Sequence, residues 1–242
     1  MKIVKLETFT NEYVGFVKVT TDTENFGWGQ MSTYNSDITA QIFHRQVAPW
    51  TMGLDLMEEK PDFADHLQII IEREHKYPGS YLLRALSGLD TALWDLYGRI
   101  KELPVASLIG GSPKQIRVYG SSMRRDINPE EESFRLCKLR DECGFTAFKF
   151  RVGSECGRDQ DEWEGRSKQI VKLLSKELGD KVEKLVDGNS CYSPQKAINL
   201  GKYLEDYGIC HFEEPCPYWE HDQTKKVKDA LSLDVAGGEQ DC

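Results

Sequence analysis

The stretch KLVDGNSCYSPQKAINLGKYLEDYGICHFEEP, residues 184–215, has the pattern of a strand, a helix and a second strand. KLVD and ICHFE are short and mainly apolar, and each ends on a carboxylate. The segment SPQKAINLGKYLEDYG between them has its apolar residues at helical spacing. Two strands joined by such a helix lie parallel in one sheet with a right-handed crossover. The stretch therefore predicts a parallel sheet with helical connections.

The same alternation extends in both directions along the chain. The expected strands are IRVYGSS (116–122), FTAFKFRVG (145–153), KLVDGN (184–189), ICHFEEP (209–215) and LDVAGGE (233–239), with four helices between them. A doubly wound open sheet and a TIM-type (β/α) barrel both have this order of elements. Acidic residues at the strand ends favour the barrel, and five strands with four helices are an incomplete set, because the closed barrel has eight of each.

The first 112 residues have a different pattern. KIVKLETF and VGFVKVTT alternate like antiparallel strands, and the segments 37–50, 63–77 and 80–103 carry apolar residues at helical spacing. IGGSP (109–113) ends this region, since a glycine pair suits a turn and a proline stops a helix. We therefore predict an α+β domain over residues 1–112 and a partial (β/α) barrel domain over residues 113–242.

The composition excludes several classes of protein. The chain has 242 residues with 31 basic and 40 acidic side chains, a net charge of −9, and its basic residues are scattered, which argues against nucleic-acid and anionic-membrane partners. Residues 1–10 lack a signal-peptide core, and no apolar stretch reaches the roughly 20 residues of a membrane span. Seven cysteines without a CxxC pair indicate reduced thiols. We expect a cytoplasmic protein.

Three carboxylates recur at one interval. Asp187, Glu213 and Glu239 are separated by 26 residues each (213 − 187 and 239 − 213), which is one strand and helix repeat. They are expected at the C-terminal ends of successive strands about 4.8 Å apart, where like charges repel unless a cation lies between them. Oxygen ligands of this kind suit Mg²⁺. A single carboxylate at a strand end more often caps the next helix or contacts solvent. The regular spacing of these three favours a metal site. Glu214, the residue after Glu213, is expected to project from the opposite face of the strand.

A second group of candidates lies in FKFRVG (148–153). Lys149 and Arg151 are two residues apart and project to one face of a strand, with Phe148 and Phe150 on the other. A basic pair on a strand is usually a solvated edge. If the aromatic rings pack against helices, however, the two cations line the mouth of the barrel. There they would bind a carboxylate substrate, and the pKa of the lysine is expected to fall.

Several motifs together resemble the mandelate racemase and muconate lactonizing enzyme branch of the enolase superfamily. They are ALSGLDTALWDLYGRIKELPVASLIGG (85–111), LVDGNSCYS (185–193) with FEEP (212–215), and GGEQ (237–240), in the order and spacing of that branch. The resemblance implies a capping domain over a barrel, Mg²⁺ on Asp187, Glu213 and Glu239, and Lys149 and Arg151 at the family's lysine-x-lysine base motif. It also implies removal of the α-proton of a carboxylate through an enediolate intermediate.

The chain departs from the family pattern at Arg151, because arginine does not readily lose a proton. This favours a lyase, an acid-sugar dehydratase, over a racemase, an epimerase, a cycloisomerase or a non-catalytic relative that keeps only the metal site. Substrate choice in the family lies with loops of the capping domain, so Tyr34 and Asn35 are candidate substrate contacts, or simply surface residues. Asn189 is a further candidate, or makes a turn.

The resemblance also gives an expectation for the chain as a whole. The family's histidine and aspartate acid/base pair lies on later strands than the five expected here. We therefore expect the 242-residue chain to bind Mg²⁺ without turnover, and the full-length protein to be a homo-oligomer.

Overall fold

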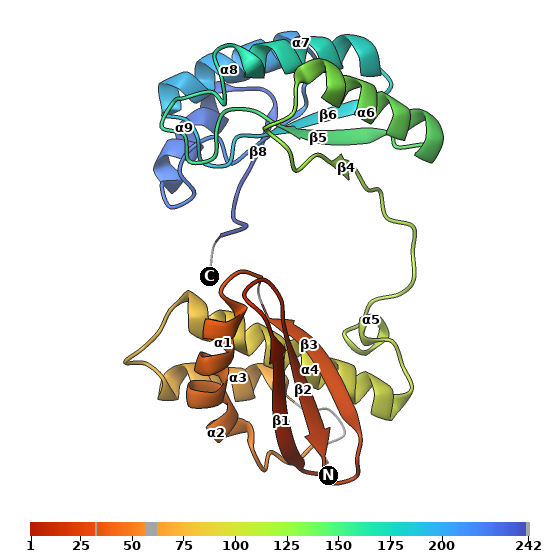
Figure 1. Ribbon diagram of the computed structural model, residues 1–242, viewed down its shortest axis with the longest axis vertical. Helices are drawn as coiled ribbons and strands as arrows, with labels where there is room; N and C mark the ends of the chain where they lie inside the picture. Colours follow the sequence, from red (N-terminus) through yellow and green to blue (C-terminus); the bar gives the residue numbers. More distant parts are fainter. Residues whose placement is uncertain (32, 57–61, 241–242) are drawn as a thin grey trace. The chain divides into compact units, whose positions relative to one another are not determined.

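The computed structural model describes residues 1–31, 33–56 and 62–240 (Figure 1). They form two compact units, Met1–Gln115 and a second that begins at Ile116. Each unit has its own hydrophobic core. No helix in the described ranges is long and apolar enough to cross a membrane.

The first unit is a three-stranded antiparallel sheet covered by helices. The strands β1 (Ile3–Thr10), β2 (Gly15–Thr21) and β3 (Phe26–Met31) lie in this order in the sheet. The helices are α1 (Ser36–Ile42), the π-helical η1 (Phe43–Val47), α2 (Ala48–Thr51), α3 (Phe63–Arg73), α4 (Ser80–Lys101) and α5 (Val105–Leu108). The predicted antiparallel strands and helices are thus present, although the helix expected over 37–50 is divided into three segments.

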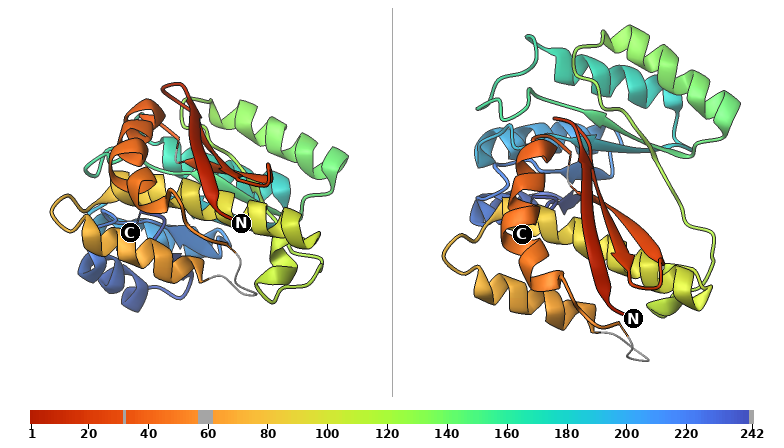
Figure 2. Two further views of the ribbon diagram at one scale, coloured as in Figure 1. Left: turned by 90° about the horizontal axis from the view of Figure 1, so that it is seen from below. Right: turned by 60° about the horizontal axis from the view of Figure 1, so that its bottom comes forward.

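Glycines allow α4 to lie directly against the sheet (Figures 1 and 2). A Cβ atom on Gly29 would be 2.0 Å from the carbonyl oxygen of Gly88, and one on Gly27 would be 2.2 Å from that of Ala92. Because the obstructing atoms belong to the backbone of α4, only residues without a side chain fit at these places in β3. The Trp28 backbone N–H also donates to Asp95 of α4 at 2.8 Å.

The second unit is a five-stranded parallel sheet with strand order β4-β5-β6-β7-β8. Its elements in chain order are β4 (Gly120–Ser121), α6 (Pro129–Cys143), β5 (Ala147–Arg151), α7 (Arg166–Leu178), β6 (Glu183–Asp187), α8 (Pro194–Asp206), β7 (His211–Glu213), α9 (His221–Ala230) and β8 (Asp234–Ala236). Sequential strands are neighbours, as in a barrel, and this confirms the predicted parallel sheet with helical crossovers. The four helices cover one face of the sheet (Figure 1).

Alternation along the strands separates the core from the open face. Phe148, Phe150, Val186 and Phe212 are buried in one cluster with apolar side chains of α6, α7, α8 and α9. The residues between them in sequence therefore project from the opposite face of the sheet. The predicted position of Phe148 and Phe150 against the helices is correct, and it leaves Lys149 and Arg151 on the face without helices.

All five strands of this sheet are shorter than predicted, and β4 and β8 show what ends them. β4 has only two residues, whereas the sequence predicts a strand over 116–122, and the side chains of Ile116 and Val118 are exposed. β4 is an edge strand in the described sheet and pairs only with β5, through Gly120 and Ser121, so residues 116–119 lie outside the strand pairing. β8 ends at Ala236, before the glycine pair 237–238, so Glu239 is not at the end of the strand.

Candidate functional site

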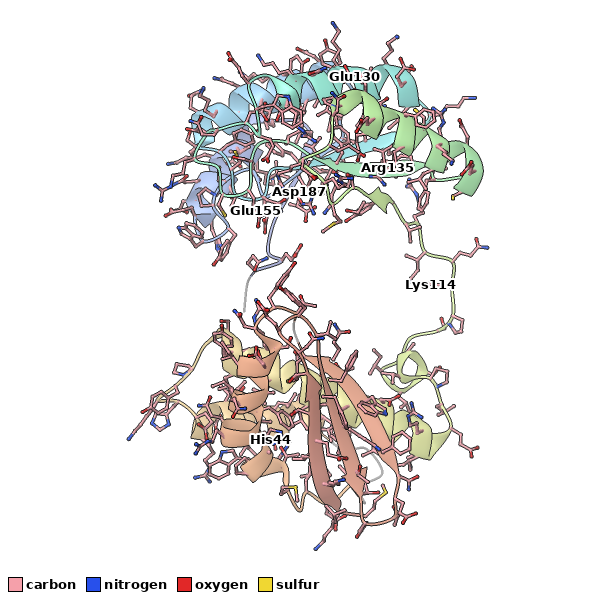
Figure 3. The ribbon with its side chains drawn as sticks, in the orientation of Figure 1. His44, Lys114, Glu130, Arg135, Glu155 and Asp187 are labelled. Carbon is pink, nitrogen blue, oxygen red and sulfur yellow. The ribbon has the colours of Figure 1, made fainter. Side chains whose placement is uncertain are left out.

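The C-terminal ends of β5, β6 and β7 bring charged residues into one row. Arg151 pairs with Asp187 in the parallel register, and Asp187 pairs with Glu213 (Asp187 is labelled in Figure 3). Each is the last residue of its strand. Since side chains at paired positions project to the same face, the two carboxylates are neighbours on the open face of the sheet.

Two cations lie among these carboxylates. Lys149 Nζ donates to Glu213 and is 3.5 Å from Asp187 Oδ2. Arg151 Nη1 donates to Asp187 and, at 2.7 Å, to Asn189 Oδ1. Both cationic residues are only 7% exposed. The structure thus brings together five of the predicted residues, Asn189 among them, and each carboxylate is paired to a cation.

The electrostatics of Lys149 differ from the prediction. Burial by itself lowers the pKa of Lys149, but the hydrogen bond to Glu213 and the charges of Asp187 and Glu213 raise it more. The net result is a pKa above the ordinary value of a lysine. The predicted fall was wrong because the carboxylates contact the ammonium group directly and favour its charged form.

Asn189 connects a further arginine to the row. Its side-chain oxygen accepts from Arg151 and from Arg125 Nη2, and its backbone N–H donates to Asp187 Oδ1 at 2.8 Å. Arg125 comes from the loop between β4 and α6 and also donates to the Gly153 carbonyl at 3.0 Å. Burial and then the charge of Arg151 lower the pKa of Arg125. The sequence analysis missed Arg125, which has no motif of its own and stands beside the similar Arg124.

The other two glutamates of this region occupy different surroundings. The residue of β8 that pairs with Glu213 is Ala236, and Glu239 lies three residues later with an exposed side chain. Glu214 is buried and lines a cavity of about 220 Å³ together with Cys216, Tyr218, His221, Thr224, Gly237 and Gly238. Its Oε1 atom has no hydrogen-bond partner among the described residues. Glu214 therefore lies beside the N-terminal end of α9, next to the row of charges but not in register with it.

Burial raises the pKa of Glu214, and the charges of Asp187, Glu239 and Glu213 raise it further, against a smaller lowering by a hydrogen bond with Asn189. The folded state then holds this proton more tightly than the unfolded state, so stability falls as pH rises above about 4.3. We expect Glu214→Gln to be more stable than the wild type at pH 7 in metal-free buffer, and to lose this advantage below about pH 4.

Urea unfolding between pH 4 and 7.5 with a chelator measures this difference. The exposed Glu164 offers a matched control, because Glu164→Gln should not change stability at either pH. A Glu214→Gln difference that stays the same at every pH would contradict the assignment.

The donor set at the strand ends fits a magnesium ion in part. Asp187 and Glu213 offer carboxylate oxygens at adjacent positions, which Mg²⁺ prefers. Over the described ranges, no three or more His, Cys, Asp or Glu side chains are grouped closely enough to hold a metal. Asp187 and Glu213 therefore suit two of the three predicted ligand positions, and Glu239 as the third ligand stays a prediction.

The predicted substrate contacts of the capping domain lie in the first unit. Tyr34 is 70% exposed, and the Asn35 side chain donates to the Tyr81 hydroxyl at 3.2 Å. Both have left-handed backbone conformations, with φ of 61° and 51°. The roles of Tyr34 and Asn35 in substrate binding stay predictions.

Two family models match the chain over most of its length. The mandelate racemase / muconate lactonizing enzyme N-terminal domain matches residues 3–110, and the enolase C-terminal domain-like family matches residues 134–242. The chain belongs to the enolase superfamily, in the mandelate racemase and muconate lactonizing enzyme branch. The resemblance on which the predicted site rests is thereby confirmed.

Solved enolase-superfamily structures support the fold. A candidate racemase from Roseobacter denitrificans is 58% identical, with a TM-score of 0.95, and the match covers 100% of this chain and 65% of that one. A mandelate racemase/muconate lactonizing protein from Paracoccus denitrificans PD1222, complexed with magnesium, is 26% identical, with a TM-score of 0.89 over 99% of this chain and 65% of that chain.

Among curated proteins, arabinonate dehydratase from Saccharolobus solfataricus is 30% identical over 167 residues, which are 65% of this chain and 40% of the dehydratase. Further curated relatives of the superfamily are acid-sugar dehydratases and a lactone cycloisomerase. The chain thus spans less than two thirds of the length of the relatives it matches.

Proposed function

We propose that the protein is an Mg²⁺-dependent lyase. It removes the α-proton of a sugar-acid carboxylate and dehydrates the acid. The observation that carries this proposal is the row in which Lys149 and Arg151 alternate with Asp187 and Glu213 at the strand ends. This is the end of parallel strands at which barrel enzymes bind their substrates. The curated acid-sugar dehydratases among the relatives support the same reaction class.

Each residue of the row has a role in the proposed reaction. Asp187, Glu213 and Glu239 would hold Mg²⁺, which when bound draws negative charge toward the carboxylate oxygens of the substrate. Lys149 and Arg151 bind those oxygens and stabilise the charge that develops on them as the α-proton passes to a base outside this row. The β-hydroxyl group then takes up a proton and leaves as water. Asn189 is held by Asp187 and the two arginines. In the proposed reaction it would contact a substrate hydroxyl group.

Arg151 favours dehydration over racemisation. A racemase returns the proton from a second base, and Arg151 stands at the position of the family's lysine base on this strand. A guanidinium group keeps its proton at neutral pH, so Arg151 binds anions and does not exchange protons. Racemisation remains the alternative outcome, because the 58% identical relative is described as a candidate racemase. We also propose that the full-length protein is a homo-oligomer in the cytoplasm.

Proton NMR in D₂O separates the outcomes. The full-length protein is incubated with a panel of sugar acids and Mg²⁺, and the same samples with a chelator serve as controls. Dehydration gives a 2-oxo-3-deoxy acid, whereas racemisation or epimerisation gives deuterium at the α-carbon without loss of water. If neither appears with any acid in the panel, the proposed function is wrong.

Arg151→Lys tests whether a lysine at position 151 acts as the base that the family carries there. A lysine there can lose a proton, so we expect α-proton exchange to rise at least about tenfold while dehydration falls. Arg117→Lys is the control, since Arg117 is exposed and pairs with Glu183 at the far end of β6. If Arg151→Lys left exchange and dehydration both unchanged, Arg151 would have no part in the site.

A further inference from the structure

We propose that the substrate is a sugar diacid and that Arg125 binds its second carboxylate. This inference rests on the proposed function and names the substrate class of the same site. It starts from the hydrogen bonds of Arg125, which go to the Gly153 carbonyl and the Asn189 side-chain oxygen. Both acceptors are neutral.

Within the described residues Arg125 makes no ion pair, whereas the neighbouring arginines each make one. Arg151 pairs with Asp187, and Arg124 pairs with Asp126 through two hydrogen bonds of 3.0 and 2.9 Å. No carboxylate of the described chain makes an ion pair with Arg125, although it is half-buried and shares an acceptor atom with a second guanidinium. Partly buried charges are normally paired. We therefore expect the guanidinium group of Arg125 to bind an anion from outside the chain.

Acidic side chains do lie in the neighbourhood. Arg125 lines a cavity of about 380 Å³ with Met123, Asp126, Ser154, Glu155 and Glu162 (Glu155 is labelled in Figure 3). Glu155 and Glu162 are exposed and make no ion pair with Arg125. A carboxylate bonded directly to the guanidinium gains charge-assisted hydrogen bonds that these solvated glutamates do not make.

The order of contacts across the site indicates which cation each carboxylate of the substrate would meet. Lys149 contacts Glu213 and Asp187; Arg151 contacts Asp187 and Asn189; Arg125 contacts Asn189. A substrate whose reacting carboxylate lies at Lys149 therefore reaches Arg125 only at its far end. Arg151 adds a buried Nε atom without a partner among the described residues. A chain with hydroxyl groups between two carboxylates matches this order.

Titration calorimetry with Mg²⁺ compares six-carbon monoacids with the diacids of the same stereochemistry, such as gluconate with glucarate and galactonate with galactarate. For the full-length wild type we expect the preferred diacid to bind at least tenfold more tightly than its monoacid. Because Arg125 also helps to hold Asn189, Arg125→Gln is expected to affect both acids, but it should weaken the diacid at least tenfold more than the monoacid. Arg124→Gln, the adjacent and ion-paired arginine, should change neither.

Arg125 also joins loops, so the variants are checked by urea unfolding, and Arg125→Lys provides a version that keeps the charge. It should retain more diacid affinity than Arg125→Gln. If diacids and monoacids bind the wild type alike, or if Arg125→Gln weakens both alike, this inference is wrong while the proposed function stands. If no acid binds in an Mg²⁺-dependent way, the proposed function fails and this inference fails with it.

Discussion

Glu213→Gln is expected to weaken Mg²⁺ binding by at least about 100-fold, whereas Glu214→Gln leaves it within about threefold. The two glutamates are adjacent in sequence but have different surroundings. Glu213 pairs in register with Asp187 and contacts Lys149 on the open face of the sheet. Glu214 lines the cavity beside α9. A glutamine keeps the shape of the side chain but removes the negative charge that a divalent ion requires.

Calorimetric titration of Mg²⁺ into the wild type and the two variants measures this effect. Asp234→Asn is a further control, because Asp234 is exposed at the start of β8 and lies at the other end of the strands from the row of charges. Equal losses in Glu213→Gln and Glu214→Gln would contradict the assignment of Glu213 as the ligand. An unchanged affinity in Glu213→Gln would remove the magnesium site from this position.

The largest expected effect on stability is that of Gly29→Ala in β3, a loss of about 3 kcal/mol or more in the free energy of unfolding. The new Cβ atom would be 2.0 Å from the Gly88 carbonyl oxygen and 2.6 Å from the Ala92 nitrogen. Both atoms belong to the backbone of α4, so no side-chain rotation relieves the clash. The strand and the helix would have to separate and expose part of the core between them.

Urea unfolding monitored by circular dichroism tests this expectation. Gln30→Ala in the same strand is the control, because Gln30 is exposed on the opposite face of β3. It should change stability by less than about 0.5 kcal/mol. A loss below about 1 kcal/mol for Gly29→Ala would show that β3 and α4 pack less closely than the structure indicates.

The sequence predicts the parallel sheet because its signals are local and periodic. Phe148 and Phe150 alternate with Lys149 and Arg151, and this two-residue period alone indicates which side chains enter the core. One strand and helix per repeat likewise places Asp187 and Glu213 at neighbouring strand ends. These features depend on residues close in sequence, so no knowledge of distant contacts is needed to predict them.

Other features depend on contacts that the sequence does not show. Equal spacing suggested that Glu239 ends its strand, but β8 stops at Ala236 before two glycines. The pKa of Lys149 rises because two carboxylates from other strands contact its ammonium group. Neither result follows from the residues beside Glu239 or Lys149 in sequence.

The sequence by itself determined the order of strands and helices, the face on which each strand residue lies, and the family of the chain, because periodicity and motif order are properties of neighbouring residues. Only the tertiary structure decided that Arg125 meets Arg151 at one oxygen of Asn189, since the two arginines come from different loops and strands. It also decided that Glu214 lies in a cavity beside α9. Charges separated along the chain interact only once folding brings them within a few ångströms and excludes water from between them.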